Sequence, residues 1–301
     1  MVSQRGFTTP PTFNPLQFRL LSAVDGPHPL TGHLKLGLAF SPDDCSVPVE
    51  YATTCVTGFG DAKEPTGEVP WRGANPFVVY SWVDCSLVGI GYEELRRRTE
   101  AAHRNNVQTR VEEVFWTGGA YSTYPHLAYN GVQIDEQGPG DDMIVLQTAA
   151  STLVTGTVDV VEGISRLEEA MGDCYSGTPV LHMPQSVVAH LAANHLVEVK
   201  NAQLRTTNGS IIAAAPGYPG TSPAGAAPAD GTAWIYATGA VKMWSSPLDF
   251  TARNAAEVLQ RDVNGTVLVA EQWFALAWDC CHFAIPVSLG GVITGTARSA
   301  T

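Results

Sequence analysis

Residues 92–115 contain neither proline nor glycine, and charged side chains recur along the whole stretch. Proline removes a backbone donor and glycine weakens a helix interior, so this stretch predicts one uninterrupted helix of about 36 Å. Gly118 and Gly119 follow it, and glycine readily adopts the left-handed backbone that ends many helices. A helix this long constrains the fold, because other elements or other molecules must cover its sides.

The apolar residues of this helix fall on two arcs. Tyr92, Leu95 and Ala102 share the first arc, and the second is rotated by about a third of a turn. The second arc consists of Val107, Val111, Val114 and Phe115. A helix whose apolar face changes midway contacts different neighbours along its length. We therefore expect a spine helix that serves two layers.

Runs rich in β-branched and aromatic residues, which are typical of strands, flank this helix. Three precede it, LKLGLAF, VPVEYATTCV and PFVVYSWVDCSLV, and TVLVAEQWFALAWDCCHFAIPVSL brings the chain back after Asn264-Gly265. The segment 58–76 between the second and third runs is polar and rich in glycine and proline. So long a connection is uncommon inside a compact domain, and we expect a long hairpin whose tip projects from the body.

The region between these β-rich runs mixes helix and strand signals. Asp159 and Glu162 form a capping-box-like helix start, and apolar residues then recur at helical spacing. Those residues are Val160, Ile164, Leu167 and Met171. Pro184 opens a second helix after a buried strand at 178–183, and Asn208-Gly209 predicts a hairpin. The order of elements predicts an α+β fold built from two intermingled halves.

Residues 1–40 are rich in proline and show little periodicity. Proline fixes its own backbone torsion and withholds a donor, which predicts an extended arm. The arm carries the apolar residues Phe7, Phe13, Leu16, Phe18 and Leu20. Exposed, these side chains would be adhesive, so we expect the arm to lie on a neighbouring molecule.

The chain has little charge for its size. Charged residues make up 15% of its 301 residues, against about 25% in a typical soluble domain. We infer that copies of the same chain cover much of the surface. The net charge of -12 disfavours binding to nucleic acid. No apolar run is long enough for a membrane helix, and the N-terminus lacks the apolar core of a secretory signal.

The six cysteines form no CxxC motif, and we expect them to be small buried apolar side chains. Cys280, Cys281 and His282 are the best candidates for a thiol or metal site, although adjacent strand residues point to opposite faces. HExxH, GxSxG and phosphate-loop motifs are absent. We therefore expect no catalytic, cofactor-binding or metal-binding residues.

The stretch GYEELRRRTEAAHRNNVQTRVEEVFWTGG, followed by VVEGISRLEEAMGDCYSGTPVLHMPQSVVAHLAAN, resembles major capsid proteins of tailed bacteriophages of the Hong Kong 97 type. It is most similar to those of phages that infect actinobacteria. The resemblance covers most of residues 80–290 and rests on the order and spacing of its motifs. It implies an icosahedral shell built from hexamers and pentamers around double-stranded DNA.

The resemblance also assigns parts to the chain. It implies an N-terminal arm at 1–40, an extended loop at 41–85, a peripheral domain at 86–156 and 246–301, and an axial domain at 157–245. Scaffolding, portal and decoration proteins are the further partners that it implies, without a membrane. The protein would be made in the host cytoplasm and reside in the virion.

Contacts between subunits are expected at the arm, at the tip of the extended loop and at the loop 217–231. The candidate residues are Phe7, Phe13, Phe18, Lys63, Glu64, Trp71, Arg72, Tyr218 and Pro219. Two alternatives stay open. One is an encapsulin-like bacterial nanocompartment shell protein, and the other is a thiol- or metal-dependent enzyme centred on Cys280, Cys281 and His282.

Overall fold

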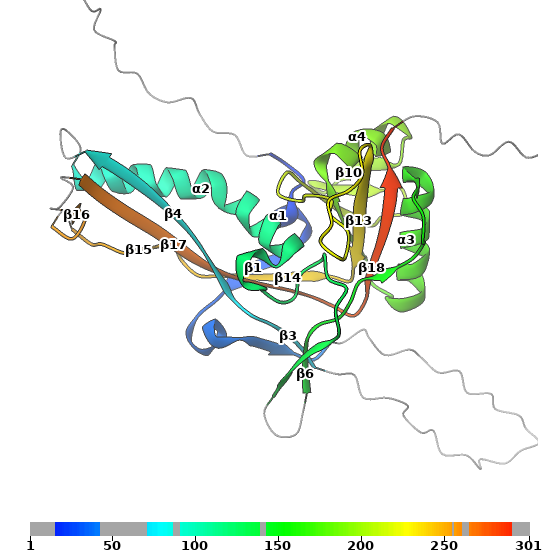
Figure 1. Ribbon diagram of the computed structural model, residues 1–301, viewed down its shortest axis with the longest axis horizontal. Coiled ribbons are helices and arrows are strands. Elements are labelled where there is room, and N and C mark those ends of the chain that lie inside the picture. Colours follow the sequence, from blue (N-terminus) through cyan, green and yellow to red (C-terminus); the bar gives the residue numbers. More distant parts are fainter. Residues whose placement is uncertain are drawn as a thin grey trace, which may run out of the picture.

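The computed structural model describes residues 16–42, 71–86, 91–138, 143–254, 256–260 and 265–290. Figure 1 shows an elongated molecule with two main parts. A long helix and a long pair of strands extend to one side, and a second sheet with two helices forms the other end. A small third sheet lies below the junction.

The extended part is a six-stranded sheet built around β17 (Gly265–Trp278). β4 (Phe77–Ser86) pairs with it antiparallel along all ten of its residues. The other edge of β17 pairs with three shorter strands, and a fourth is added in parallel beyond them. These strands are β14 (Val241–Ser245), β15 (Asp249–Phe250), β16 (Leu259–Gln260) and, outermost, β1 (Asp25–Pro29).

The helix α2 (Tyr92–Thr117) includes the whole predicted stretch 92–115 and packs along β4 and β17. Its two apolar arcs enter separate cores: Leu95 packs near Leu268 in a small cluster, whereas Val111 and Phe115 belong to the main one. Gly118 ends the helix with a φ of 78°, and its N–H bonds to the Val114 carbonyl. The predictions of a spine helix with two apolar arcs and of its glycine stop are confirmed.

The other end of the molecule is an eight-stranded mixed sheet. Its strand order is β10-β11-β12-β9-β13-β18-β7, and β8 pairs with β18 as well. The bounds are β7 (Ser151–Thr152), β8 (Val158–Asp159), β9 (Val180–Pro184), β10 (Val197–Lys200), β11 (Gln203–Thr206), β12 (Ile211–Ala215), β13 (Thr232–Thr238) and β18 (His282–Ser288). The hairpin predicted at Asn208-Gly209 is the β11–β12 turn.

Two helices cover one face of this sheet, α3 (Val160–Cys174) and α4 (Gln185–Ala193). The Asp159 side chain accepts a hydrogen bond from the N–H of Glu162, which confirms the predicted helix start. Alternate strand residues face the opposite side: Leu181 packs under α3 and α4, whereas Val180 packs toward α2. The C-terminal end of α2 therefore covers the second face.

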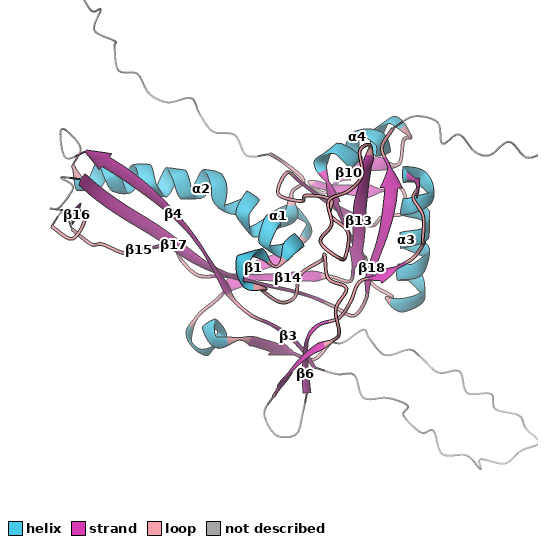
Figure 2. Ribbon diagram, viewed as in Figure 1, coloured by secondary structure: helices cyan, strands magenta, loops and turns pink. Residues whose placement is uncertain are grey.

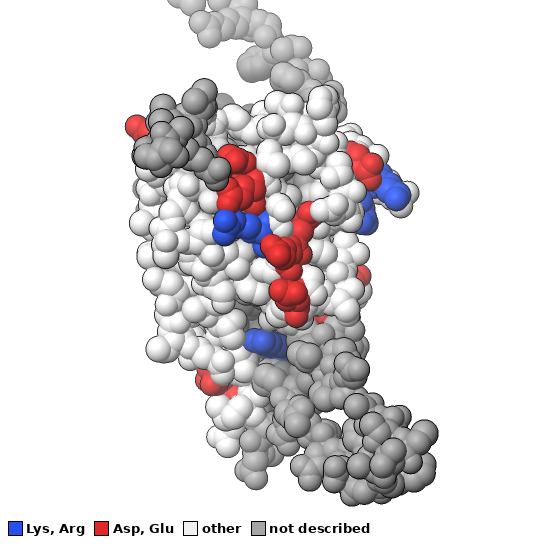
Figure 3. Space-filling model, turned by 90° about the vertical axis from the view of Figure 1, so that its right-hand side faces the viewer, with Lys and Arg blue, Asp and Glu red and all other residues white. Residues whose placement is uncertain are grey.

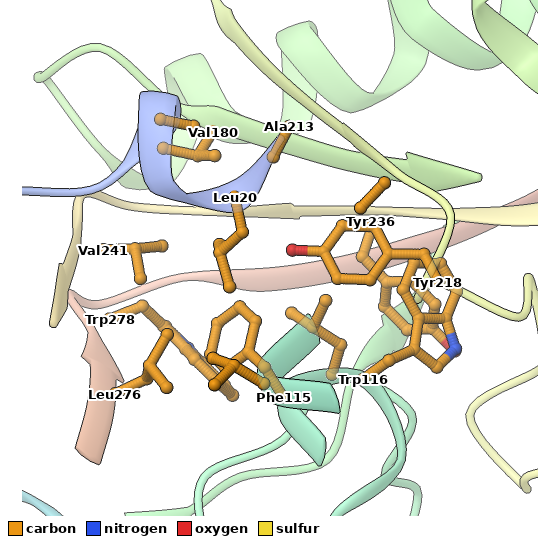
Figure 4. Packing of buried hydrophobic residues seen from close by; sticks show 14 of the residues in the cluster. Leu20, Phe115, Trp116, Val180, Ala213, Tyr218, Tyr236, Val241, Leu276 and Trp278 are labelled. Carbon is orange, nitrogen blue, oxygen red and sulfur yellow. The ribbon is translucent and has the colours of Figure 1, made fainter. Parts of the chain in front are cut away.

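Aromatic side chains fill the main core, where the end of α2 meets both large sheets (Figure 4). Trp116 is fully buried, lies edge-on to Tyr236 at 4.8 Å between ring centroids, and donates its ring N–H to the Thr221 hydroxyl. Tyr236 donates to the Thr221 carbonyl. Both polar ring groups thus have partners, as buried aromatic residues require.

The third sheet has the order β2-β3-β6-β5. Its strands are β2 (Leu38–Phe40), β3 (Trp71–Ala74), β5 (Ile134–Gln137) and β6 (Met143–Gln147). The first strand of the hairpin predicted around 58–76 lies outside the described residues, and the second, β4, pairs with β17. β2 and β3 pair antiparallel, although β3 lies within the segment predicted to be the hairpin tip. The residues between them, 43–70, lie outside the described residues.

Residues 16–40 are not an extended arm, which corrects the prediction for this segment. They form the short helix α1 (Leu20–Ala23), β1, the turn η1 (Gly32–Leu36) and β2. Leu20 is buried in the main core, and Arg19 forms a buried ion pair with Glu112 of α2 at 2.6 Å. The prolines of this segment fit because β1 is an edge strand, where a missing donor costs no ladder bond.

Candidate assembly interface

A groove of about 760 Å³ runs between the β4 strand and the second half of α2. It is lined by residues 77–82, by Asn106, Arg110 and Val114 of α2, and by the turn at 119–123, which includes η2 (Gly119–Tyr121). Of these lining residues, Arg110 carries a charge, and it is paired with Glu113 at 2.6 Å. The groove therefore offers a largely uncharged surface.

The side chains of β4 alternate between a covered and an exposed face. Val79 is buried, and the Ser81 hydroxyl lies 3.2 Å from Nδ1 of His103 on α2. On the opposite face Tyr80 is 61% exposed and Trp82 is 60% exposed, and their rings stack with centroids 5.9 Å apart. Tyr121 at the end of the groove is 94% exposed. Apolar surface of this kind, gathered in one place, is typical of interaction sites.

The edge of β4 adds a second property to the groove. One edge pairs with β17 along the whole strand, and no other strand within the described residues pairs with it. An unpaired edge of ten residues presents donors and acceptors that readily pair with a strand of another chain. The aromatic face and the open edge together fit an extended segment of a neighbouring molecule.

The contact residues predicted from the sequence do not all reach the surface. Trp71 is 40% exposed on β3, and Pro219 is exposed in the loop after β12. Phe18 packs against the core of its own chain, and Arg72 is half-buried with its guanidinium 3.4 Å from the Cys280 carbonyl. The remaining candidates Phe7, Phe13, Lys63 and Glu64 lie outside the described residues.

Tyr218 is the clearest departure from the predicted contacts. It is buried in the main core, with its ring 4.9 Å from that of Trp116. The neighbouring Gly217 explains this position, because a Cβ there would collide with the Thr109 carbonyl of α2. A residue without a side chain lets the loop lie directly against the helix, and Tyr218 then points into the core.

Sequence reasoning missed Tyr80, Trp82 and Tyr121. The alternation in FVVYSWVD was present in the sequence and identified a strand, but both sets of alternating residues include apolar side chains. Period-two patterning shows which face is buried when the other face is polar. In β4 the exposed face is aromatic, so the pattern could not distinguish the two faces.

The structure contradicts the alternative thiol site at Cys280, Cys281 and His282. Cys174 and Cys281 form a disulfide, and Cys280 is also disulfide-bonded. The prediction of small buried side chains is confirmed for Cys281, which is 3% exposed, and wrong for Cys174, which is exposed. The disulfide bonds were not predicted. The pairing of Cys174 with Cys281 spans 107 residues of sequence, so residue spacing could not reveal it.

His282 is equally unsuited to bind a ligand. It is 5% exposed, with its ring stacked on Tyr236 and 4.8 Å from that of Trp278. Burial lowers the pKa of His282 to about 3, so the ring is neutral at ordinary pH. Across the part of the chain that the structure describes, no cluster of three or more His, Cys, Asp or Glu residues could hold a metal ion. No described helix is long and apolar enough to span a membrane.

No family model matches the sequence, and no curated protein is similar to it. Solved structures are similar in fold. The capsid of the native GTA particle aligns with a TM-score of 0.56 and 9% identity, over 96% of each chain. The capsid of Ralstonia phage GP4 aligns with a TM-score of 0.52 and 10% identity, again over 96% of each. The structure of Mycobacterium phage Ogopogo aligns with a TM-score of 0.50 and 11% identity, over 95% of this chain and 97% of the other. The chain therefore has the Hong Kong 97-type fold of phage capsid subunits.

Proposed function

We propose that the chain is the structural subunit of an icosahedral virus capsid. Its copies form hexamers and pentamers, and these build a shell around packaged double-stranded DNA. The observation that carries this proposal is the match of fold to phage capsid structures over nearly the full length of both chains. Agreement over 96% of each chain means that this chain has counterparts for nearly all parts of such a subunit.

The surface supports a chain that works among copies of itself. In Figure 3 uncharged residues cover most of the drawn face, and acidic side chains gather in a central band. The groove beside β4 adds exposed aromatic side chains and an open strand edge. A free monomer gains nothing from such features, whereas a subunit in a shell buries them against its neighbours.

We propose that the two large sheets belong to different domains of the subunit. The six-stranded sheet and α2 would form the centre of a peripheral domain at 86–156 and 246–301. The eight-stranded sheet would form the centre of an axial domain at 157–245. The pairing of β18 with β13 favours adding residues 282–288 to the axial part. Residues 1–40 and 41–85 would correspond to the arm and the extended loop, and residues 16–40 of that arm fold onto the body of their own subunit.

The partners follow from the same proposal. The subunit binds itself, and scaffolding, portal and decoration proteins complete the particle. The net charge of -12 favours a wall to which packaged DNA does not adhere, so DNA is enclosed without sequence-specific binding. The protein would be synthesised in the host cytoplasm and reside in the virion.

We propose a structural role without catalysis. The alternative enzyme requires an ionisable thiol near an accessible histidine. Cys280 and Cys281 are both disulfide-bonded, and His282 is buried among aromatic rings. The Cys280→Ala variant distinguishes the two ideas, because an enzyme would lose activity whereas a shell subunit changes only in stability or assembly.

Electron microscopy of the purified protein, together with its mass from light scattering, tests the proposal directly. We expect closed shells, or hexamers and pentamers. A 32 kDa monomer or small dimer that persists across salt and crowding conditions would contradict it. The contents of particles recovered from the native source then distinguish a capsid from an encapsulin-like shell. A capsid holds nuclease-protected DNA, whereas an encapsulin-like shell holds a cargo enzyme.

A further inference from the structure

The helix α3 and the strand β18 lie side by side and run in opposite directions. Fifteen helical residues span about 22 Å, and the seven residues of β18 span about 23 Å, so the two elements match in length. At one end β8, which leads directly into α3, pairs with the end of β18 through Val158 and Val287. At the other end the Cys174–Cys281 disulfide joins them, with 6.2 Å between the Cα atoms.

Packing between the two ends holds the cysteines together. Gly163 of α3 lies against Val287, where a Cβ would approach Cγ1 of the valine to 2.5 Å. Leu167 and Met171 are buried in the same layer. Because these contacts do not depend on the bond, we expect the two sulfurs to stay adjacent when the bond is reduced.

The two cysteines differ in access to solvent. Cys174 ends α3 and is exposed, whereas Cys281 is 3% exposed. A solvent-borne reagent therefore reaches the Cys174 sulfur first. Burial disfavours the thiolate, so an exposed thiol is the better first nucleophile of such a pair.

We propose that Cys174 and Cys281 form a redox-controlled lock on the α3–β18 layer. The inference rests on the proposed function, in which the subunit is made in a reducing cytoplasm and its shell later meets an oxidising environment. Dithiols persist in the first compartment and disulfides in the second. The lock would be open during assembly and closed in the released particle.

Closing the lock requires an oxidant, for which a low-molecular-weight disulfide suffices. The Cys174 thiolate attacks one sulfur of this molecule, forms a mixed disulfide and expels one small thiolate, which takes a proton. The Cys281 thiolate then attacks the Cys174 sulfur and expels the second. Two protein thiols lose two electrons and two protons, and the small disulfide becomes two small thiols.

The closed bond constrains the unfolded chain over a separation of 107 residues. A loop of this size restricts the denatured state strongly, so we expect the bond alone to raise Tm by on the order of 10 °C. Reduction also opens the bond at Cys280, so the wild-type shift alone does not isolate this pair. The matched comparison is a Cys174→Ser/Cys281→Ser variant, measured with and without a phosphine reductant.

The wild type should lose about 10 °C more on reduction than the double variant does. Equal losses in the two proteins would overturn the proposal. Non-reducing peptide mapping of the oxidised protein supplies a readout that does not depend on the variant folding. We expect a peptide containing Cys174 linked to the one containing Cys281 in the wild type and in Cys280→Ser, and no such link in Cys281→Ser. A wild type without that link after oxidation would contradict the lock.

Failure of the lock and failure of the proposed function are distinguishable. Suppose that the wild type forms shells visible by electron microscopy, but reductant lowers its Tm no more than that of the double variant. This result would overturn the lock and leave the capsid proposal standing. A monomer that never assembles, yet shows the extra redox shift, would overturn the capsid proposal and retain the lock as a property of the fold.

Discussion

His182 on β9 is fully buried at the contact between α2 and the eight-stranded sheet, and its hydrogen bonds define its proton positions. The Thr238 hydroxyl donates to the Gly239 carbonyl, so its oxygen accepts from Nε2–H of His182 at 3.0 Å. Nδ1 then accepts from the Tyr218 hydroxyl at 3.3 Å. Both nitrogens of a neutral ring have partners in this arrangement, whereas a charged ring would lose its bond from Tyr218.

Burial lowers the pKa of His182 from 6.5 to about 3, and the neighbouring His282 adds to the effect. The unfolded chain takes up this proton near pH 6.5, so the unfolded state binds more protons between pH 6.5 and 3. The free energy of unfolding therefore falls as pH falls through this window. From pH 7 to pH 5 we expect His182 to account for a loss of about 2 kcal/mol.

Urea unfolding of the unassembled subunit at pH 7 and pH 5 checks this prediction. His182→Gln keeps a donor and an acceptor but cannot take up the proton, so its loss between the two pH values should be smaller by about that amount. His195→Gln is the control, because His195 is exposed. A His182→Gln protein with the same pH slope as the wild type would show that other groups cause the acid sensitivity.

At the scale of elements, α3 contains two glycines in opposite environments. Gly163 faces β18, where a Cβ would come within 2.5 Å of the buried Val287, and Gly172 has nothing within 4 Å. Gly163→Ala should therefore destabilise the protein by about 1–3 kcal/mol, because valine is stiff and fully packed. Gly172→Ala should stabilise it by about 0.5–1 kcal/mol, because alanine lowers the entropy of the unfolded chain.

Denaturant unfolding of the two alanine variants measures both effects in the same helix. Opposite signs are expected, and each variant serves as the control for the other. If both substitutions stabilise the protein, the α3–β18 contact is looser than the structure has it, and the close approach at Gly163 is not required.

The elements that the sequence predicts well are those with local signals. Asp159 caps α3, Gly118 ends α2, and the two apolar arcs of α2 enter the two cores. Such signals lie within a few residues of the structure that they specify. The α+β class and the order of the main elements followed from them.

Features that depend on residues far apart in the sequence could not be predicted from it. The Cys174–Cys281 bond joins residues 107 positions apart, and Tyr218 is buried because Gly217 lets its loop approach α2. Arg19 lay in a segment predicted to be extended, but its buried pairing with Glu112 draws the segment onto the body. Each of these contacts is defined by tertiary packing, which a single sequence does not display.

On the scale of the whole molecule, the exposed aromatic residues of the groove beside β4 should matter for assembly but not for folding. Tyr80 and Trp82 contribute little to the fold of one subunit, because both side chains are mostly exposed. In a shell the same rings would be buried, and the few interface residues that contribute about 2 kcal/mol or more are enriched in tyrosine and tryptophan. The two roles can be measured independently.

Tyr80→Ser/Trp82→Ser should leave the free energy of unfolding of the isolated subunit within about 0.5 kcal/mol of wild type. The concentration needed for assembly should rise at least tenfold, since about 1.4 kcal/mol per contact corresponds to that factor. Urea unfolding measures the stability of the subunit, and light scattering with electron microscopy measures the concentration needed for assembly.

Val132→Ser is the matched control, because Val132 is 80% exposed and does not line the groove. Equal assembly defects in the control and the double variant would mean that exposed apolar surface in general drives association. Normal assembly of the double variant would remove the groove from the interface.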